Sequence, residues 1–388
     1  MNLDDAGALR AADRGKVLAS IEGMRPQCAA ALAAARSLAL PSEMRDPQEI
    51  VVAGMGGSAL AAEIARSLLA RDLRVPLSIV RGDALPASVG PRSLVILSSY
   101  SGETEETLGA AAAALERTPR VVAITTGGAL ARRLGERGRP VLRVDPATNP
   151  SGQPRFAVGA ALFALLGLLE KIGVLDTATA WATGGGGAGA AGAGRSGESA
   201  GGGASGLERA LAALDGSRER YGADAGRAAN AAKETAFHLE ARAALVVASA
   251  HLAGNARALA NQLNETAKSF AVPFEIPELN HHLMEGLLFP ASNRGALLFV
   301  FIESPLYGAR LRARYAATRE VVARQAVAER TIAPRGDTPL AEALDALAFG
   351  SYLAYYLALR NGQDPAAIPW VDHFKARLAA LAGDRPGA

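Results

Sequence analysis

The sequence is nearly free of cysteine, with Cys28 as the only one among its 388 residues. A single cysteine excludes an internal disulfide and any zinc cluster built from several cysteines, and it is typical of proteins from a reducing compartment. Cys28 lies in an alanine-rich stretch whose neighbours would not activate a thiol, so we interpret it as a small buried residue. We expect neither a metal site nor another cofactor.

The sequence also offers no clear membrane segment. The apolar run 156–169 is too short to span a bilayer, and it contains Gly159 and Gly167. Residues 1–14 carry three aspartates and no apolar core of the kind found in secretory signals. We therefore expect a cytoplasmic protein without a membrane partner.

An excess of charge of one sign is lacking as well. Lys and Arg total 41 against 38 Asp and Glu, which gives a formal net charge of +3. So small and dispersed an excess argues against a nucleic-acid partner, although a small anionic ligand needs only a local positive site. With 49% hydrophobic and 20% charged residues the composition is globular, and 388 residues suffice for two domains.

Short β-branched runs alternate with helix-length segments, which indicates parallel sheets covered on both faces. After a helical preamble over 1–47, strands are predicted at 50–53, 76–80, 94–97, 121–125 and 141–144, and again at 244–248, 272–276, 296–302 and 326–331. Helices are predicted at 59–70, 105–117, 129–136 and 157–172, and again at 207–220, 227–239, 254–269, 307–324 and 340–361. The predicted fold is α/β, with two doubly wound domains whose parallel sheets are flanked by helices.

A segment of almost pure glycine, alanine and serine separates the two halves. Residues 183–206 carry only Arg195 and Glu198 as charged side chains and cannot bury enough apolar area to offset their ordering entropy. We predict an N-terminal domain at 1–182, a flexible linker or insertion at 183–206, and a C-terminal domain at 207–388.

The first signal for a binding site is the glycine-rich turn 54–59 (Gly-Met-Gly-Gly-Ser-Ala), which links the first strand to a helix. Glycines let a ligand approach the backbone, and a helix N-terminus offers free N–H groups and a positive dipole end to an anion. Gly56, Gly57 and Ser58 are therefore candidate anion-binding residues. The turn also fits the weak dinucleotide pattern G-x-G-x-x-G/A, and a purely structural tight turn remains an alternative.

The second signal is the hydroxyl-rich turn 98–104 (Ser-Ser-Tyr-Ser-Gly-Glu-Thr), which follows a neighbouring strand. Open α/β sheets bind ligands at such strand ends, so Ser99, Ser101 and Thr104 are expected to converge with Ser58 on one phosphate. We call the two turns 54–59 and 98–104, with these hydroxyls, the cradle. The alternative is that Thr104 only caps its helix in a capping box, which would leave Ser99 and Ser101 unused.

Two nucleotide-binding patterns do not fit. The sequence has no G-x-x-x-x-G-K-[ST], which argues against a nucleoside-triphosphate site. A nicotinamide site should have an acidic residue at the end of the second strand, but Arg81 and Gly82 stand there and Asp83 comes late. A monophosphate fits the second turn better than a dinucleotide.

The two turns together resemble the phosphate-binding signature of sugar isomerase (SIS) domains. Later segments resemble, in the same order, the bifunctional phosphoglucose/phosphomannose isomerases. They are 154–157 (Pro-Arg-Phe-Ala), 264–268 (Asn-Glu-Thr-Ala-Lys) and 275–281 (Glu-Ile-Pro-Glu-Leu-Asn-His). The resemblance extends from the first strand to the C-terminus, apart from the glycine-rich insertion. It implies two SIS domains and a sugar phosphate as the small-molecule substrate.

Aldose–ketose isomerisation needs a base that moves a proton between C1 and C2, a group that opens the sugar ring, and positive charge near the enediolate. The resemblance implies that Glu265 is the base, that Arg155 stabilises the enediolate and that Lys375 assists at the ring oxygen or hydroxyls. It implies that His281 opens the ring in the active site of the other subunit, so a homodimer is expected.

The chain departs from the family pattern at three places. The loop 366–368 (Ala-Ala-Ile) lacks a hydroxyl at a place where some relatives use one for mannose-type substrates, so the resemblance supports the mannose activity less than the glucose activity. Glu103 places a carboxylate beside the presumed phosphate, which would weaken binding unless its side chain points away. After His281 the family's Asn-Glu is replaced by His282 and Leu283. A noncatalytic sugar-phosphate sensor and a nicotinamide oxidoreductase remain competing hypotheses; the sensor would keep the cradle without the convergence of Glu265, His281, Arg155 and Lys375.

Overall fold

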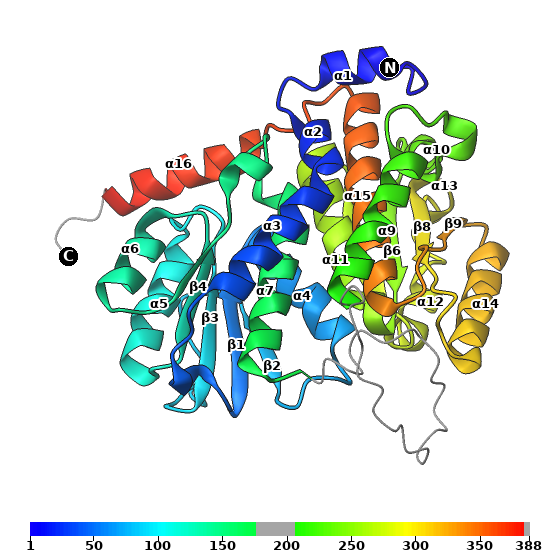
Figure 1. Cartoon of the computed structure of the whole chain (residues 1–388). Coiled ribbons are helices and arrows are strands. Elements are labelled where there is room, and N and C mark those ends of the chain that lie inside the picture. Colours follow the sequence, from blue (N-terminus) through cyan, green and yellow to red (C-terminus); the bar gives the residue numbers. More distant parts are fainter. Residues whose placement is uncertain (176–205, 384–388) are drawn as a thin grey trace.

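The computed structural model describes residues 1–175 and 206–383 and contains two parallel sheets, one in each half of the chain (Figure 1). The first sheet has the strand order β2-β1-β3-β4-β5, with all neighbours parallel. Its strands are β1 Glu49–Gly54, β2 Leu77–Val80, β3 Ser93–Ser98, β4 Val121–Thr125 and β5 Val141–Arg143. Strands β3 and β4 are buried along their whole length, as expected where helices cover both faces.

The second sheet has the order β7-β6-β8-β9 and repeats the arrangement of the first four strands of the first sheet. Its strands are β6 Ala243–Ala248, β7 Ala271–Glu275, β8 Leu297–Ile302 and β9 Ala328–Ile332. The predicted α/β fold with two doubly wound parallel sheets is thus confirmed, and each predicted strand is present within about two residues. The predicted segment 183–206 lies outside the described residues, apart from Gly206, where a helix begins.

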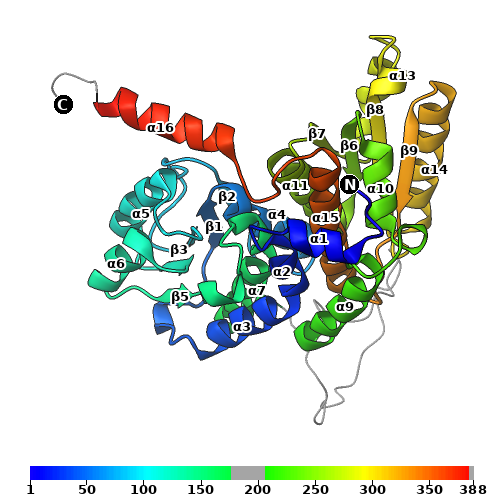
Figure 2. The same ribbon diagram turned by 90° about the horizontal axis from the view of Figure 1, so that it is seen from above.

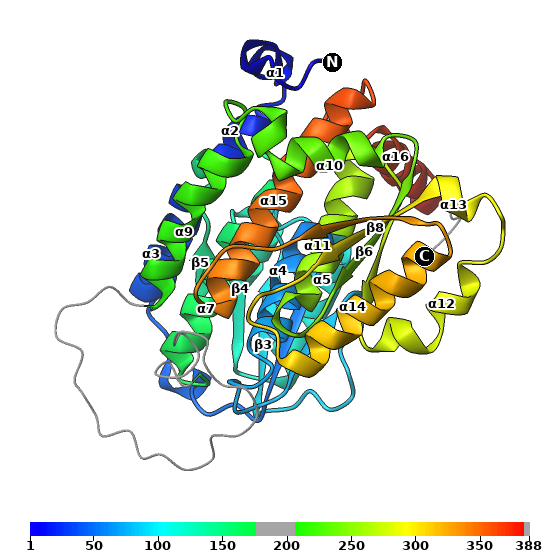
Figure 3. The ribbon, with the colours of Figure 1, turned by 90° about the vertical axis from the view of Figure 1, so that its right-hand side faces the viewer.

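Helices flank both sheets (Figures 1 and 3). In the first half they are α1 Ala6–Ala12, α2 Val17–Glu22, α3 Met24–Ser37, η1 Ser42–Met44, α4 Gly56–Leu68, α5 Glu105–Arg117, α6 Gly128–Glu136, η2 Pro146–Thr148, η3 Pro154–Phe156 and α7 Val158–Ile172. In the second half they are α9 Gly206–Tyr221, η4 Arg227–Ala229, α10 Ala231–Leu239, η5 Ala250–Leu252, α11 Ala253–Gln262, η6 Leu263–Ala267, η7 Glu278–His281, α12 Leu283–Gly286, α13 Asn293–Ala296, α14 Ala309–Arg324, α15 Pro339–Arg360 and α16 Pro369–Gly383.

Two predicted helices of the second half are interrupted. The helix predicted at 227–239 is divided because Asn230 caps α10, accepting hydrogen bonds from the N–H groups of Ala232 and Lys233. The helix predicted at 254–269 changes after Gln262 into the π-helical turn η6. Among the described residues, no helix is both long and apolar enough to cross a membrane.

The halves pack together through α4 and α11, the helices that follow the first strand of each sheet. Gly254 permits this close crossing, since a Cβ added there would lie 2.5 Å from the carbonyl of Glu63. A single apolar cluster runs from the helical preamble through α7 and α11 to α15. The loop that follows β5 lies against the first turn of α4 and is bonded to η6, which follows α11, and the candidate site lies there.

Candidate active site

The first turn of α4 forms one side of the candidate site. Gly56 has φ +49°, a left-handed conformation that favours glycine, and a Cβ added there would meet nothing within 4 Å. Gly57 lies against the loop before α7: an added Cβ would be 2.9 Å from the Pro154 carbonyl and 3.1 Å from the Arg155 nitrogen. Glycine at 57 therefore lets the Arg155 loop lie directly against the N-terminus of α4.

The turn between β3 and α5 is held by its own hydroxyl groups. The hydroxyls of Ser99 and Thr104 lie 2.9 Å apart, and the N–H of Gly102 donates to Ser99 Oγ over 3.1 Å. Ser99 is buried, whereas Ser101 is exposed and accepts a bond from the Glu103 N–H. Thr104 occupies the N-cap position of α5, yet its side chain makes no capping hydrogen bond. The capping-box alternative is therefore wrong for this hydroxyl.

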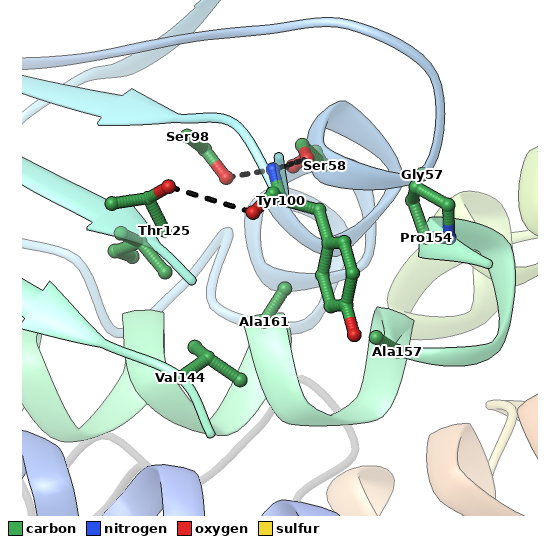
Figure 4. Close-up of a pocket in the computed structure, with 10 residues that line it drawn as sticks. Gly57, Ser58, Ser98, Tyr100, Thr125, Val144, Pro154, Ala157 and Ala161 are labelled. Atoms are coloured by element: carbon green, nitrogen blue, oxygen red, sulfur yellow. Dashed lines mark hydrogen bonds between the residues drawn. The ribbon is translucent and has the colours of Figure 1, made fainter. Parts of the chain in front are cut away.

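The two turns contact each other through Ser58. Its Oγ accepts a hydrogen bond from the Tyr100 N–H over 3.1 Å, and its carbonyl accepts one from Ser98 Oγ over 3.3 Å (Figure 4). A small pocket behind this contact is lined by the turns and by the start of α7, and the Tyr100 ring points into it. Hydroxyls and N–H groups from two strand ends thus gather at one edge of the first sheet, the arrangement that a phosphate monoester requires.

Glu103 does not add an unpaired negative charge to this arrangement. Its Oε1 accepts a hydrogen bond of 2.8 Å from the Ala129 N–H in the first turn of α6. A carboxylate at a helix N-terminus is stabilised by the helix dipole. The departure from the family pattern is therefore used to hold α6 against the second turn.

Arg155 connects the two halves beside the cradle. Its side chain is buried, and its guanidinium donates to Thr266 Oγ1 over 3.0 Å and to the carbonyls of Pro365 and Ala366 over 2.8 and 2.7 Å. Burial lowers the pKa of Arg155, an effect that the negative charges of Glu265 and Asp364 partly offset. The guanidinium is therefore fixed beside the turn that carries Glu265.

Glu265 lies half-buried in the π-helical turn η6, which ends at Lys268 with φ +52°. Such turns occur frequently at functional sites. Bonds to distant segments hold this one: Asn361 donates to the Ala267 carbonyl over 3.0 Å, and Asn264 exchanges hydrogen bonds with Ala271 at the start of β7. The position of the carboxylate is thus set by tertiary contacts.

Lys268 is a charged neighbour of Glu265 that sequence reasoning did not single out. Its Nζ donates to the carbonyls of Thr266 and Asp364. Burial and then the positive charge of Arg155 lower the pKa of Lys268, while Asp364 and Glu265 act in the opposite direction. Its position in the sequence could have indicated this residue, because it lies three residues after Glu265 on a predicted helix and residues three apart share a helix face.

His281 lies away from Glu265 of its own chain. It ends η7, beyond the C-terminal end of β7, and is exposed. Glu265 precedes the other end of that strand, whose five residues extend over about 13 Å. Within one chain the structure therefore does not bring these two predicted residues together.

Lys375 is carried on α16, which extends outward from the second half past the α5 side of the first half (Figure 2). The side chain is exposed. At the base of this helix, Trp370 and Phe270 line an open hollow of about 750 Å³ together with Asn264 and Lys268. The structure thus joins Arg155 and Glu265 beside the cradle, and leaves His281 and Lys375 on the surface.

Two family models match the chain. Residues 43–134 match the SIS domain, and residues 228–378 match the bacterial phospho-glucose isomerase C-terminal SIS domain. The chain is also similar to the bifunctional phosphoglucose/phosphomannose isomerase of Caldicellulosiruptor bescii, with 26% identity over 93% of this chain and 98% of that protein. The protein of the same name from Aquifex aeolicus is 26% identical over 85% of this chain and 90% of its own length.

Solved structures share the fold at low sequence identity. A hypothetical protein of Thermus thermophilus has a TM-score of 0.68 and 16% identity, covering 98% of this chain and 94% of that one. A glucose-6-phosphate isomerase like protein of the same organism has a TM-score of 0.56 and 18% identity, covering 96% of this chain and 98% of that one. Similarity over both full lengths agrees with two sheets in tandem.

Proposed function

We propose that this chain, which belongs to the bifunctional phosphoglucose/phosphomannose isomerase family, interconverts glucose 6-phosphate, and also mannose 6-phosphate, with fructose 6-phosphate. The observation that carries the proposal is the continuous contact from the cradle at Gly57, through the Arg155 backbone and guanidinium, to the turn that holds Glu265. A sugar phosphate held in the cradle would present its other end to the carboxylate. We also propose that the two domains span 1–182 and 207–388 and that the protein is cytoplasmic.

The proposed reaction is a proton transfer through an enediol. The phosphate binds to the N–H groups of Gly56 and Gly57 and to the hydroxyls of Ser58, Ser99, Ser101 and Thr104. Glu265 takes the proton from one carbon and returns it to the other, while Arg155 stabilises the negative oxygen that forms between these steps. Lys268 adds a second positive charge on the same side, which is our addition to the residues expected from the sequence.

The competing functions have less support. A sensor that only binds sugar phosphate does not need a half-buried carboxylate beside a buried guanidinium, because removing charges from water is costly. A nicotinamide enzyme needs a free acidic group near Arg81. Glu63 is the acidic partner there; although burial alone would raise its pKa, hydrogen bonds from Arg81 and Arg66 hold the pKa below its ordinary value. That carboxylate is already paired and unavailable to a ribose.

Removing one cradle hydroxyl should weaken substrate binding. Thr104→Val keeps the side-chain shape but removes the hydroxyl, and a hydrogen bond to a charged group contributes about 1.5–3 kcal/mol. We expect KM for fructose 6-phosphate to rise about tenfold or more, with a smaller change in kcat. Steady-state kinetics with a coupled assay measures both.

Thr107→Val is the matched control. Thr107 lies one turn further along α5, and its buried Oγ1 has no hydrogen-bond partner among the described residues. The same chemical change there should leave KM unchanged. Equal effects of the two substitutions would contradict the cradle.

We further propose that the chain acts as a homodimer, with His281 contributed to the partner's site. Support comes from large apolar side chains exposed on α16, where Trp370, Phe374 and Leu378 follow one another at four-residue spacing, with exposures of 80%, 62% and 46%. Four-residue spacing places them on one helix face. A second copy of the chain is the partner that would cover this stripe.

Two charges on that stripe should disrupt the dimer. We expect the double variant Phe374→Glu, Leu378→Glu to elute as a monomer in size-exclusion chromatography with light scattering, and to lose activity with the dimer. Ala376→Glu places the same charge on the opposite face of α16 and should stay dimeric. An intact dimer in the double variant would place the interface elsewhere.

A further inference from the structure

Four acceptors hold the guanidinium of Arg155, and all four are uncharged. Nε donates to the Thr266 hydroxyl over 3.0 Å, and Nη2 donates to the carbonyls of Pro365 and Ala366 over 2.8 and 2.7 Å. The fourth acceptor is the side-chain oxygen of Gln153, which accepts from Nη1 over 2.8 Å. Because a guanidinium carries only donors, this contact also fixes which end of the Gln153 amide faces Arg155.

One N–H of this buried guanidinium remains without an acceptor. An arginine side chain has five N–H donors, and the four hydrogen bonds leave the second hydrogen of Nη1 unpaired among the described residues. Arg155 is only 2% exposed, and a buried donor without an acceptor costs free energy. A bound oxyanion would supply the missing acceptor. The nitrogen that Gln153 binds is therefore the one that has a hydrogen left for a ligand.

No carboxylate is among the groups that hold Arg155. Glu265 and Asp364 act on it electrostatically and partly offset the effect of burial on its pKa, but neither is one of its four acceptors. The half-buried Arg220, by contrast, forms an ion pair with Asp345. Uncharged acceptors hold the Arg155 guanidinium in place without cancelling its charge.

The backbone of Gln153 is fixed from the side of the cradle. Its carbonyl accepts a hydrogen bond of 3.0 Å from Nδ2 of the buried Asn149, and the same nitrogen donates to the Tyr100 hydroxyl over 3.1 Å. The Gln153 N–H donates to Ser151 Oγ over 3.3 Å. Tyr100 belongs to the second turn of the cradle, and its ring directs the hydroxyl toward the start of α7 (Figure 4). Hydrogen bonds thus connect the cradle, through Asn149 and Gln153, to Arg155.

We propose that Gln153 is a positioning residue for the isomerisation: its neutral side-chain oxygen orients Nη1 of Arg155, so that one N–H and the uncancelled positive charge act on the enediolate. Gln153 acts through Arg155 and is not itself a catalytic residue. The inference deepens the proposed function and rests on it, because the enediolate forms only in that reaction.

Replacing Gln153 by glutamate separates this role from simple packing. Gln153→Glu keeps the size of the side chain and an acceptor oxygen, and a carboxylate binds a guanidinium more strongly than an amide does. A purely structural role would therefore be preserved, and the melting temperature should not fall. We expect kcat for fructose 6-phosphate to fall about tenfold or more, because the new charge cancels that of Arg155. KM should stay the same, because the cradle is untouched.

A second variant and a control complete the test. Gln153→Met keeps the length of the side chain but removes the amide oxygen, and it should also lower kcat. By calorimetry it should bind a sugar-phosphate hydroxamate, an anionic mimic of the enediolate, more weakly than the unchanged chain does, with no change in affinity for inorganic phosphate. Gln48→Glu makes the charge change at an exposed residue before β1, at the edge of the sheet opposite the cradle, and should leave kcat unchanged.

The outcomes separate this inference from the proposed function. If the unchanged chain isomerises fructose 6-phosphate and Gln153→Glu has the same kcat, the positioning role is overturned and the isomerase stands. A chain that does not isomerise this substrate would overturn both. If Gln153→Glu does not fold, Gln153→Met decides: an unchanged affinity for the hydroxamate would overturn the inference.

Discussion

Replacement of Glu265 by glutamine should abolish most of the isomerase activity while substrate still binds. Glutamine keeps the size and the hydrogen-bonding capacity of the side chain but cannot accept a proton from carbon, and a positioned general base contributes about 10²–10⁴-fold. We expect kcat to fall ~100-fold or more. The Kd for fructose 6-phosphate, measured by calorimetry, should change far less because the cradle is untouched.

Proton exchange separates loss of the base from a general disturbance of the site. An enediol mechanism transfers solvent hydrogen to the carbon skeleton, which proton NMR in D₂O detects as loss of the C1 signal of fructose 6-phosphate. Glu265→Gln should stop this exchange together with turnover. Glu320→Gln, the same change at an exposed ion pair with Arg324 on α14, should leave both unchanged. Exchange that continues in Glu265→Gln would assign the base to another residue.

The structure explains why Glu265 tolerates burial beside other charges. Arg155 and Lys268 both lie close enough to have their pKa values influenced by its carboxylate, and Asp364 acts on the same two cations. Two positive and two negative groups thus compensate one another in a partly buried cluster. Removing the carboxylate leaves the cations with less compensation, so the Gln variant should bind an anionic transition-state mimic such as a sugar-phosphate hydroxamate no more weakly than the unchanged chain.

The strands and the two turns could be predicted because their signals are local. Buried parallel strands favour apolar β-branched runs, the left-handed φ at Gly56 favours glycine, and the close approach of the Pro154 carbonyl favours glycine at 57. The π-helical turn around Glu265 could not be predicted in the same way, since its hydrogen bonds reach Asn361 and Arg155, about a hundred residues away in either direction. Local sequence indicated only a helix there.

The contacts of buried polar groups could not be predicted from sequence patterns either. Glu342 lies among alanines and leucines in a largely apolar helix, and its partners His251, in η5, and Ser304, after β8, belong to no recognisable motif. From the sequence, Glu103 was expected to weaken phosphate binding. Its contact with the N-terminus of α6 could not be predicted, because that contact depends on how the second turn folds. In both cases the charge is understood only once its partner in space is known.

The position of His281 leads to the second large effect, which concerns two subunits. β7 separates His281 from Glu265 of its own chain, and the histidine is exposed on the far side. If His281 opens the ring in the partner's site, His281→Ala should lower activity on the cyclic sugar phosphate by about 10²-fold or more. The open-chain form, trapped in pre-steady-state mixing, should be affected much less.

Mixing the two inactive variants then decides between a site built within one chain and a site shared by two. In a heterodimer of Glu265→Gln and His281→Ala, one site combines the intact Glu265 of one chain with the intact His281 of the other, and the second site lacks both. Random exchange of equal amounts makes half of the dimers mixed, so activity should return to about a quarter of that of the unchanged protein. Subunit exchange is verified with affinity tags of two kinds. Because a site within one chain would lack one of the two residues in every subunit, mixed dimers that stay inactive would place His281 outside the shared mechanism.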